Sequence, residues 1–583
     1  MCEALRDLPR GASRFVASHP NQHRDAFPMT TLFHGTRFGP RGVQFSIWAP
    51  RARQLTLRLD GRDLSMSRQP DGFFTTEVPE AKPGSRYSVV FDDGRVRPDP
   101  ASRWQPDGVH KDSALFDPAR FRWTDSAWKG VPQHELVFYE LHVGTFTEGG
   151  TFDTAAERLP ELVELGVTCV ELLPVQAFPG DRNWGYDGVQ PYSVQHSYGG
   201  PEGLQRFVDR AHALGLAVCL DVVYNHLGPE GNYLNDFGPY FTSRHRSPWG
   251  DGVNFDGEDA GPVRAYAVGS AMQWVRDFHV DALRLDAVHA IPDDSPRHVV
   301  GELCDAVRAY AQQSGRHIHV VAESDMNDRK VVDPAPKGWG CSASWSDDFH
   351  HALHVLLTGE QAHFYADFAR DDLARALAEG FVYQGQESKF RKKRHGTDTR
   401  GLRPEQFVVF AQNHDQVGNR PTGERLTALV PPEALTAIAA AVVLGPGLPL
   451  IFMGEEYGET NPFLYFTSHS DPQLAKAVSE GRKSEFIAAG GVGEVPDPQS
   501  QETFARSRLT HRRDGRHGEL RRTFKELLAL RRRLSSRFAE EWPKVRVEGT
   551  RFTLERSFLE VTVNLGPSAQ GDLPAWGYRV REK

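Results

Sequence analysis

The sequence has few cysteines and no paired arrangement of them. The 583 residues contain Cys2, Cys169, Cys219, Cys304 and Cys341, and no two of these form a CxxC pair. An odd, scattered set excludes a disulfide framework and a structural zinc site as organising features. Three of the thiols, those at 169, 219 and 304, occur in apolar runs, where we expect reduced side chains that pack as small hydrophobes.

Long apolar runs and an excess of positive charge are absent as well. No stretch reaches the roughly 18 to 20 consecutive apolar residues of a membrane helix, and the N-terminus lacks the apolar run of a signal peptide. Acidic residues number 77 against 68 lysines and arginines, so the net charge of −9 supplies no broad positive field for nucleic acid. These absences predict a cytoplasmic protein that binds neither membrane nor nucleic acid.

The composition is that of a folded protein with several parts. Hydrophobic residues make up 39% of the chain and aromatic residues 10%, which is enough for a buried core. Residues 1–28 are polar and lack periodicity, so we expect a disordered tail there. Across 29–125, short alternating runs divided by Gly, Pro and Asp turns predict an immunoglobulin-like β-sandwich of the carbohydrate-binding type.

Between residues 126 and 541 apolar runs alternate with amphipathic stretches. Eight such runs begin at Leu136, Val167, Leu216, Val280, His317, Cys341, Phe407 and Leu448. Eight strands with helices between them predict an α/β protein built on a (β/α)₈ TIM barrel. A Gly-, Asp- and aromatic-rich segment at about 227–262 predicts a small inserted subdomain, and weak alternation over 542–583 predicts a short C-terminal β-domain.

Polar residues end several of these runs, at the face where barrels of this kind hold their active sites. The strand-end residues are Asp221, Asn225, His226, Arg284, Asp286, Glu323, Asn413, His414 and Asp415. One carboxylate at a strand end is usually a helix cap or a solvated loop residue. Four strand ends that carry such groups together indicate a catalytic site.

The carboxylates favour glycoside hydrolysis. Asp286 and Glu323 fall on adjacent strands, which lie about 5 Å apart, close to the carboxyl separation of retaining glycosidases. Arg284 shares the strand face of Asp286 and can hold that carboxylate ionised. We therefore expect Asp286 to be the nucleophile and Glu323 the acid, with Asp415 stabilising positive charge on the sugar ring.

Four strings in this order, DVVYNH, LRLDAVH, VAESD and QNHDQ, resemble the motif regions of the α-amylase superfamily. The resemblance covers about residues 35–540. The strings YELHVGTF, NWGYDG, SWSDDFHHALH, YQGQ and EGRKSEF are similar to those of the maltooligosyltrehalose trehalohydrolases. That resemblance implies cleavage of the α-1,4 bond beside a terminal trehalose, an oligosaccharide substrate, and a pathway companion, maltooligosyltrehalose synthase, that makes this substrate.

The resemblance also implies residue roles. Asp286 would be the nucleophile, Glu323 the general acid/base and Asp415 the transition-state stabiliser. Substrate-binding positions would be Tyr186, Asp187, Asp221, His226, Arg284, His289, His414 and Gln416. Asp347 and Asp348 end the sixth run, and from that position we expect them to bind sugar hydroxyls. No cofactor and no metal is implied, because side chains fill the acid, base and nucleophile roles.

Other interpretations stay open at this point. A glycogen branching enzyme has the same kind of sandwich and catalytic triad, and a non-catalytic glycan-binding barrel is a rival from a different class. His350, His351 and His354 have the spacing of a helical metal site, although no HExxH is present. Trp184, Trp249 and Phe255 are candidates either for stacking on sugar rings or for the core.

Overall fold

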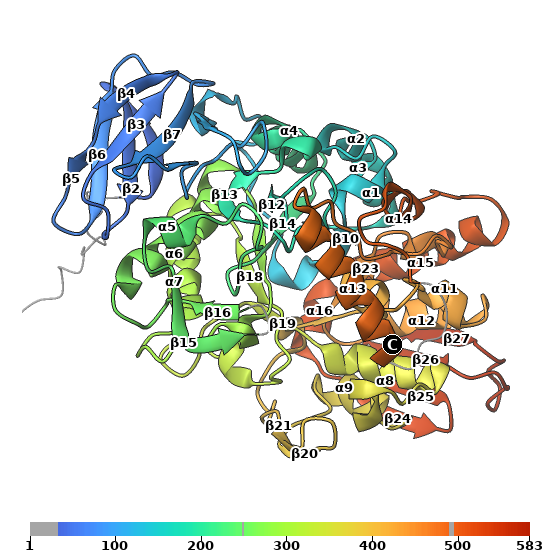
Figure 1. Cartoon of the computed structure of the whole chain (residues 1–583). Coiled ribbons are helices and arrows are strands. Elements are labelled where there is room, and N and C mark those ends of the chain that lie inside the picture. The colour runs from blue at the N-terminus through green and yellow to red at the C-terminus, as the bar shows by residue number, and fades with distance from the viewer. Residues whose placement is uncertain (1–32, 248–249, 489–494) are drawn as a thin grey trace, which may run out of the picture.

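The computed structural model describes residues 33–247, 250–488 and 495–583. The predicted tail 1–28 and Trp249 lie outside these residues. Two antiparallel sheets open the chain (Figure 1, blue). Their strands are β1 (Gly35–Gly39), β2 (Gly42–Trp48), β6 (Phe73–Val78) and β5 (Ser67–Arg68) in one sheet, and β4 (Arg62–Ser65), β3 (Leu55–Leu59), β7 (Arg86–Phe91), β8 (Val96–Arg97) and β9 (Ser113–Ala114) in the other. The sheets pack face to face, since the rings of Phe45 and Tyr87 meet edge-on with centroids 5.2 Å apart.

A closed barrel of eight parallel strands occupies the centre of the molecule. The strands follow chain order: β10 (Phe138–Leu141), β11 (Cys169–Leu172), β14 (Ala217–Val222), β17 (Ala282–Leu285), β18 (His319–Ala322), β19 (Ala343–Trp345), β22 (Phe407–Val409) and β23 (Leu448–Phe452). The last strand pairs with the first and closes the ring. Each predicted run contains one of these strands, so the predicted barrel is confirmed.

The barrel interior consists of an apolar layer and a charged layer above it. Phe138, Cys169, Cys219 and Ala282 belong to one buried cluster inside the ring. Two residues further along the same strands stand Glu140, Glu171, Asp221 and Arg284, all buried. Because strand side chains alternate with a period of two, a residue that points inward is followed by another two positions later. The charged layer therefore faces the carboxyl-terminal mouth of the barrel.

Helices lie around this barrel and at its carboxyl-terminal mouth (Figure 1). They are α1 (Val143–Phe146), α2 (Phe152–Ala156), α3 (Leu159–Leu165), α4 (Gly200–Ala213), α6 (Ala260–Asp277), α7 (Val299–Ser314), α8 (Asp347–Thr358), α9 (Leu373–Glu379), α10 (His414–Gly418), α11 (Leu426–Leu429), α12 (Ala434–Val443), α13 (Pro472–Ala488), α14 (Gln501–Arg506), α15 (Gly515–Arg533) and α16 (Ser535–Glu540). Helix α4 shows why they form: Leu204, Phe207, Val208 and Ala211 repeat at helical spacing and are all buried. Within the described residues no helix is both long and apolar enough to cross a membrane.

The segment between β14 and α6 leaves the barrel as an excursion. It contains α5 (Leu234–Phe237) and a hairpin of β15 (Phe241–Ser247) and β16 (Gly250–Val253). Asp236 on α5 binds the N-terminal sheets, because Arg95 Nη1 lies 2.5 Å from its Oδ1 and Arg97 Nε lies 2.6 Å from its Oδ2. Two shorter hairpins, β12 (Gln176–Ala177) with β13 (Gln190–Val194) and β20 (Gln386–Ser388) with β21 (Lys393–His395), also flank the barrel.

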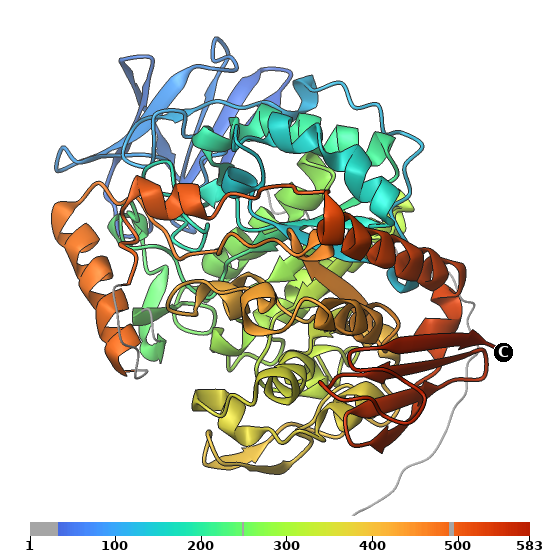
Figure 2. The same cartoon turned by 90° about the vertical axis from the view of Figure 1, so that its right-hand side faces the viewer.

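A four-stranded antiparallel sheet ends the chain, on the opposite side of the molecule from the N-terminal sheets (Figure 2). Its strands are β24 (Lys544–Glu548), β25 (Arg551–Glu555), β26 (Leu559–Asn564) and β27 (Tyr578–Glu582). Two buried arginines bind the end of α12: Arg531, which belongs to α15, and Arg556, which follows β25 of this sheet. Arg531 Nη1 donates to the carbonyls of Val443 and Gly445 at 3.1 and 3.0 Å. Arg556 Nη1 donates to Leu444 at 3.2 Å, and both guanidinium groups stack on Phe538.

Candidate active site

A cleft of about 840 Å³ opens at the carboxyl ends of the barrel strands. Seven of the predicted site residues line it: Tyr186, Asp187, His226, Asp286, His289, Glu323 and Asp415. Asp286 and Glu323 directly follow Leu285 and Ala322, which are paired across the parallel strands β17 and β18. The structure therefore brings the three predicted catalytic carboxylates to one cavity.

Arg284 lies at the centre of the charged layer. Its Nη1 donates to Asp221 Oδ2 at 2.7 Å and to Asp286 Oδ1 at 2.9 Å, and its Nη2 lies 3.7 Å from Glu323 Oε2. The guanidinium is fully buried and stacks on Trp345 at 4.4 Å. Burial raises the pKa of Asp221 to about 6, although the charge of Arg284 opposes this rise. One guanidinium thus links the carboxylates of three neighbouring strands.

Asp286 is held on both of its carboxylate oxygens. Arg284 binds Oδ1, and Asn225 Nδ2 donates to Oδ2 at 2.7 Å and to the Asp286 carbonyl at 2.8 Å. Two such donors stabilise the ionised form and fix its orientation. Asn225 belongs to the strand-end group that the sequence identified, but the sequence assigned it no role.

The environment of Glu323, in contrast to that of Asp286, favours the protonated carboxyl group. Burial raises its pKa to about 8, and the charges of Asp286 and Asp415 add to that rise while Arg284 opposes it. Its Oε2 accepts the backbone N–H of Ala287 at 2.5 Å. Ala287 has a left-handed backbone, with φ of 40°, directly after Asp286. Strained conformations of this kind concentrate at functional sites. At neutral pH Glu323 therefore carries a proton, beside an Asp286 carboxyl that Arg284 and Asn225 hold.

His414 and Tyr186 lie together beside Asp221. The Tyr186 hydroxyl donates to Asp221 Oδ2 at 2.6 Å and lies 2.7 Å from His414 Nε2. The two rings stack with centroids 5.2 Å apart. His414 Nδ1 lies 2.5 Å from Glu140 Oε1. Sequence reasoning missed Glu140, although it stands near the end of the first apolar run, where the criterion applied to the other strands would have found it.

The remaining predicted binding residues lie around this centre. Asp187 accepts Asn183 Nδ2 at 2.6 Å, and His226 Nε2 lies 3.0 Å from the carbonyl of Tyr186. His289 Nδ1 lies 3.8 Å from Asp325 Oδ1. Gln416 is half-buried in the first turn of α10, where Asn413 caps its backbone N–H at 2.9 Å.

The two consecutive aspartates of the sixth strand end differ. Burial, with the charges of Glu323 and Asp415, raises the pKa of Asp347 well above its usual range. Asp348 is buried, and its Oδ2 accepts Asn327 Nδ2, Val382 N and Tyr383 N at 2.8 to 2.9 Å. Neither aspartate is among the cleft-lining residues. The structure therefore places Asp347 near Glu323, whereas the carboxylate of Asp348 binds the backbone of the 381–383 loop.

The structure also places two of the three aromatic candidates, Trp184 and Phe255, and the three histidines of α8. Trp184 lines the cleft and stacks on Phe463, whereas Phe255 is only 1% exposed and belongs to the core. The histidines of α8 do not converge on one point. His350 Nδ1 lies 2.7 Å from the carbonyl of Ala411, and His354 Nε2 lies 2.8 Å from Glu360 Oε2.

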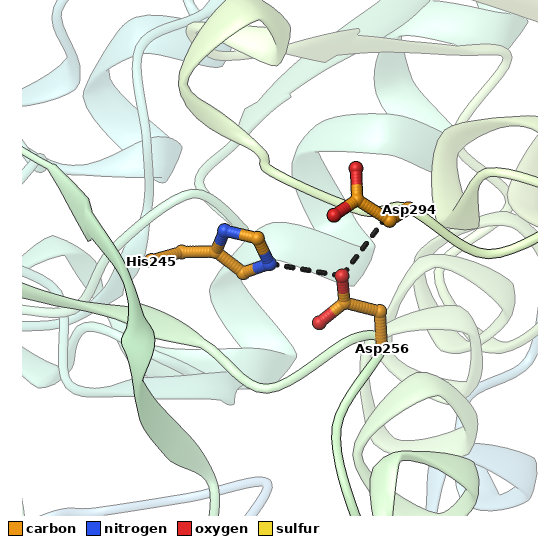
Figure 3. Close-up of side chains that lie close together, drawn as sticks. All are labelled: His245, Asp256 and Asp294. Carbon is orange, nitrogen blue, oxygen red and sulfur yellow. Dashed lines mark hydrogen bonds and ion pairs between the residues drawn. The ribbon is translucent and has the colours of Figure 1, made fainter.

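Another group of possible metal ligands lies beside the β15–β16 hairpin. Asp256 Oδ2 accepts His245 Nε2 at 2.9 Å and the backbone N–H of Asp294 at 3.0 Å (Figure 3). The guanidinium of Arg244 lies 3.6 Å from both carboxylates and supplies a counter-charge. We interpret the group as an ion-pair network that joins the hairpin to the loop before α7.

Comparison with known proteins gives the same fold and a more specific relationship. The model of the α-amylase catalytic domain matches residues 116–249. A putative α-amylase of Salmonella typhimurium superimposes with a TM-score of 0.89 at 38% identity, covering 94% of this chain and 99% of that one. A 1,4-α-glucan branching enzyme of Bacillus caldolyticus is 35% identical, but over 43% of this chain and 42% of its own length.

Two relatives match over much greater lengths. The malto-oligosyltrehalose trehalohydrolase of Saccharolobus solfataricus is 47% identical over 82% of this chain and 83% of its own length. The corresponding protein of Arthrobacter ramosus is 46% identical over 91% of this chain and 94% of its own length. With the barrel and its cleft of carboxylates, this similarity shows that the chain belongs to the malto-oligosyltrehalose trehalohydrolase family.

Proposed function

We propose that the protein is a retaining glycoside hydrolase that cleaves the α-1,4-glucosidic bond beside the terminal trehalose of maltooligosyl trehalose. The products are trehalose and a maltooligosaccharide. The observation that carries this proposal is the position of Asp286, held by Arg284 and Asn225, beside Glu323, whose raised pKa favours the protonated acid. The names of the long-matching relatives support the choice of substrate.

The first step uses these two carboxyl groups together. Glu323 donates its proton to the glycosidic oxygen while the bond between that oxygen and C1 breaks. A carboxylate oxygen of Asp286 forms a bond to C1, which gives a covalent glycosyl intermediate. Arg284 and Asn225 keep this carboxylate ionised and aligned for attack. Asp415 stabilises the positive charge that develops on the sugar ring.

The second step returns the enzyme to its starting state. The Glu323 carboxylate takes a proton from a water molecule, and the water oxygen forms a bond to C1 as the bond to Asp286 breaks. Two inversions at C1 leave the product in the α configuration. Proton NMR taken immediately after mixing is expected to show the α-anomer of the new reducing end, and a β-anomer would contradict the mechanism.

Substrate hydroxyls are proposed to bind the polar groups around the cleft. These groups are Tyr186, Asp187, Asp221, His226, Arg284, His289, Asp347, His414 and Gln416. Asp347 lies near Glu323 and makes no hydrogen bond or ion pair among the described residues, so its oxygens are available to a sugar. Trp184, which lines the same cleft, offers an apolar edge beside these polar groups.

The proposed reaction needs a supplier for its substrate. We propose a maltooligosyltrehalose synthase as this companion, because the terminal trehalose must be made on a maltooligosaccharide before it can be released. We also propose a cytoplasmic location, without nucleic acid as a partner. The cysteines of the described residues, Cys169, Cys219, Cys304 and Cys341, are all free and buried, as suits a reducing compartment.

Product analysis tests the proposal. The purified protein is incubated with maltooligosyl trehalose and, separately, with maltooligosaccharide and amylose, and the products are separated by chromatography. Trehalose released from the first substrate, with little change in the others, is the expected result. New α-1,6 branches in amylose without trehalose would replace the proposed hydrolysis with glucan branching.

Variants connect the activity to the carboxylates. Asp286→Asn and Glu323→Gln are expected to lose roughly 10³-fold or more in kcat while keeping the fold. Asp153→Asn is the matched control, because Asp153 is an exposed carboxylate paired with Arg206 on the outer surface. Full activity in Asp286→Asn would overturn the proposed role.

A further inference from the structure

Glu140 lies inside the barrel, behind His414 as seen from the cleft. Both side chains are buried, with exposed fractions of 1% for Glu140 and 0% for His414. Glu140 Oε1 lies 2.5 Å from His414 Nδ1, and Oε2 accepts the His414 backbone N–H at 2.9 Å. One carboxylate therefore binds both the ring and the backbone of this residue. Glu140 is not among the residues that line the cleft.

The opposite nitrogen of His414 lies beside two residues that line the cleft, Tyr186 and Asp415. Its Nε2 lies 2.7 Å from the Tyr186 hydroxyl and 3.4 Å from Asp415 Oδ1. The hydroxyl proton of Tyr186 is directed to Asp221, so its oxygen receives a hydrogen bond from Nε2. At Nδ1 the partner is a carboxylate, which only accepts. Both ring nitrogens therefore act as donors, and that pattern requires the charged imidazolium.

The surrounding charges show which group supplies the counter-charge. Glu171 pairs with Glu140 across β10 and β11, and burial together with the charge of Glu140 raises its pKa well above the usual range, which keeps Glu171 neutral. Burial lowers the pKa of His142 to about 4, so that ring is neutral as well. The other charged or titratable groups near His414 are Arg284, Asp221, Asp415 and Tyr186. Glu140 is thus the carboxylate bonded to this ring from behind, through Oε1 on Nδ1 and Oε2 on the backbone N–H.

We propose that Glu140 is a positioning residue that keeps His414 as an imidazolium, which in turn orients Tyr186 and Asp415 toward the reacting sugar. This inference rests on the proposed function. Burial lowers the pKa of His414, but the charges of Glu140 and Asp415 outweigh burial and raise it to about 9. The ring therefore stays charged through the pH range in which Glu323 holds its proton.

The test removes the charge of the Glu140 side chain and keeps its shape. Glu140→Gln removes the counter-charge, and the matched control Glu171→Gln alters the neighbouring carboxyl, which is already neutral. We expect kcat to fall about 10- to 100-fold in Glu140→Gln with little change in KM. The alkaline limb of its pH profile is expected to move to lower pH, because His414 then loses its proton before Glu323 does.

The kinetics of these variants decide the proposal. A wild-type kcat and alkaline limb in Glu140→Gln, or an equal shift in Glu171→Gln, would overturn it. If Glu140→Gln does not fold, Glu140→Asp keeps the charge at a shorter reach. A lower kcat with an unmoved alkaline limb then supports the proposal, whereas a shifted limb contradicts it.

A spectroscopic measurement separates this inference from the proposed reaction. In protein carrying ¹⁵N-histidine, the signals of His414 are those lost in His414→Gln. Near neutral pH both ring nitrogens are expected to be protonated in the parent chain and in Glu171→Gln, and one of them deprotonated in Glu140→Gln. A neutral His414 in the parent would refute the inference even if trehalose is released. A charged His414 without trehalose release would leave the imidazolium in place and refute the proposed function instead.

Discussion

The proton on Glu323 sets the upper pH limit of the proposed reaction. Its pKa is raised to about 8 by burial and by Asp286 and Asp415, so the acid form predominates below that value and is lost above it. Burial raises the pKa of Asp221 to about 6, and the ionised form that binds Arg284 and Tyr186 predominates above that value. The working state of the site therefore exists between these two limits.

A bell-shaped pH profile follows. We expect kcat/KM for trehalose release, measured from about pH 4 to pH 10, to have limbs near pH 6 and pH 8. The apparent values belong to the coupled carboxylates as a group. A profile that stays flat through the upper limit would show that the proton on Glu323 is not required.

A second prediction at the residue scale concerns the kcat of Asn225 variants. Asn225→Ala removes the donor to Asp286 Oδ2, and a hydrogen bond to a charged group corresponds to about 10- to 100-fold in kcat. Asn225→Asp has the same size but cannot donate in its ionised form and adds a like charge, so its loss should be larger. Steady-state kinetics on both variants would contradict this prediction if Asn225→Asp were the more active.

At the scale of elements, α10 and the loop that carries Trp184 fit closely. A Cβ added at Gly418 would lie 2.1 and 2.2 Å from Cζ2 and Cη2 of the Trp184 ring. Trp184 stacks on Phe463, and its Nε1 donates to the carbonyl of Leu464 at 2.9 Å, so the ring has little room to move. The close approach requires glycine at the end of α10.

Gly418→Ala is therefore expected to destabilise the fold by about 1–3 kcal/mol and to raise KM, because the shifted ring borders the cleft. Gly481→Ala, at a position in α13 with no atom within 4 Å of an added Cβ, is the control and should be neutral or slightly stabilising. Thermal melts and kinetics compare the two. Equal melting temperatures and equal KM values in the two variants would contradict the close packing of Gly418 on Trp184.

The elements also show what sequence reasoning can and cannot provide. The barrel strands were predictable because each is a buried run with local apolar character, even the three-residue β19. Asp286 and Glu323 were predictable because strand order determines which ends meet. The strand-end position of Glu140 could have been noticed, but its bond to His414 and the packing of Trp184 on α10 join residues more than 200 positions apart, and no local pattern encodes those contacts. Asp348 shows the reverse case: its position after a strand suggested sugar binding, but its carboxylate is used by a distant loop.

At the scale of the whole molecule, two buried arginines bond other elements to the end of α12: Arg531 from α15 and Arg556 from the C-terminal sheet. Arg531→Met removes donors to the carbonyls that end α12 and leaves them buried without partners. We expect the free energy of unfolding to fall by about 2–4 kcal/mol, with kcat at low temperature unchanged. Arg533→Met is the control, since Arg533 is exposed and pairs with Glu582 on the surface. Denaturant melts that do not distinguish the two variants would refute this role.

The contact of Asp236 with Arg95 and Arg97 has a consequence for how such enzymes diversify. Asn232 and Asn235, on the same segment as Asp236, line the cleft. The N-terminal sheets therefore hold one side of the cleft in place. A chimera that takes these sheets from a relative would also need the relative's loop, or this side of the cleft would shift. The unit that can be exchanged between family members is therefore the sheets together with the loop they support.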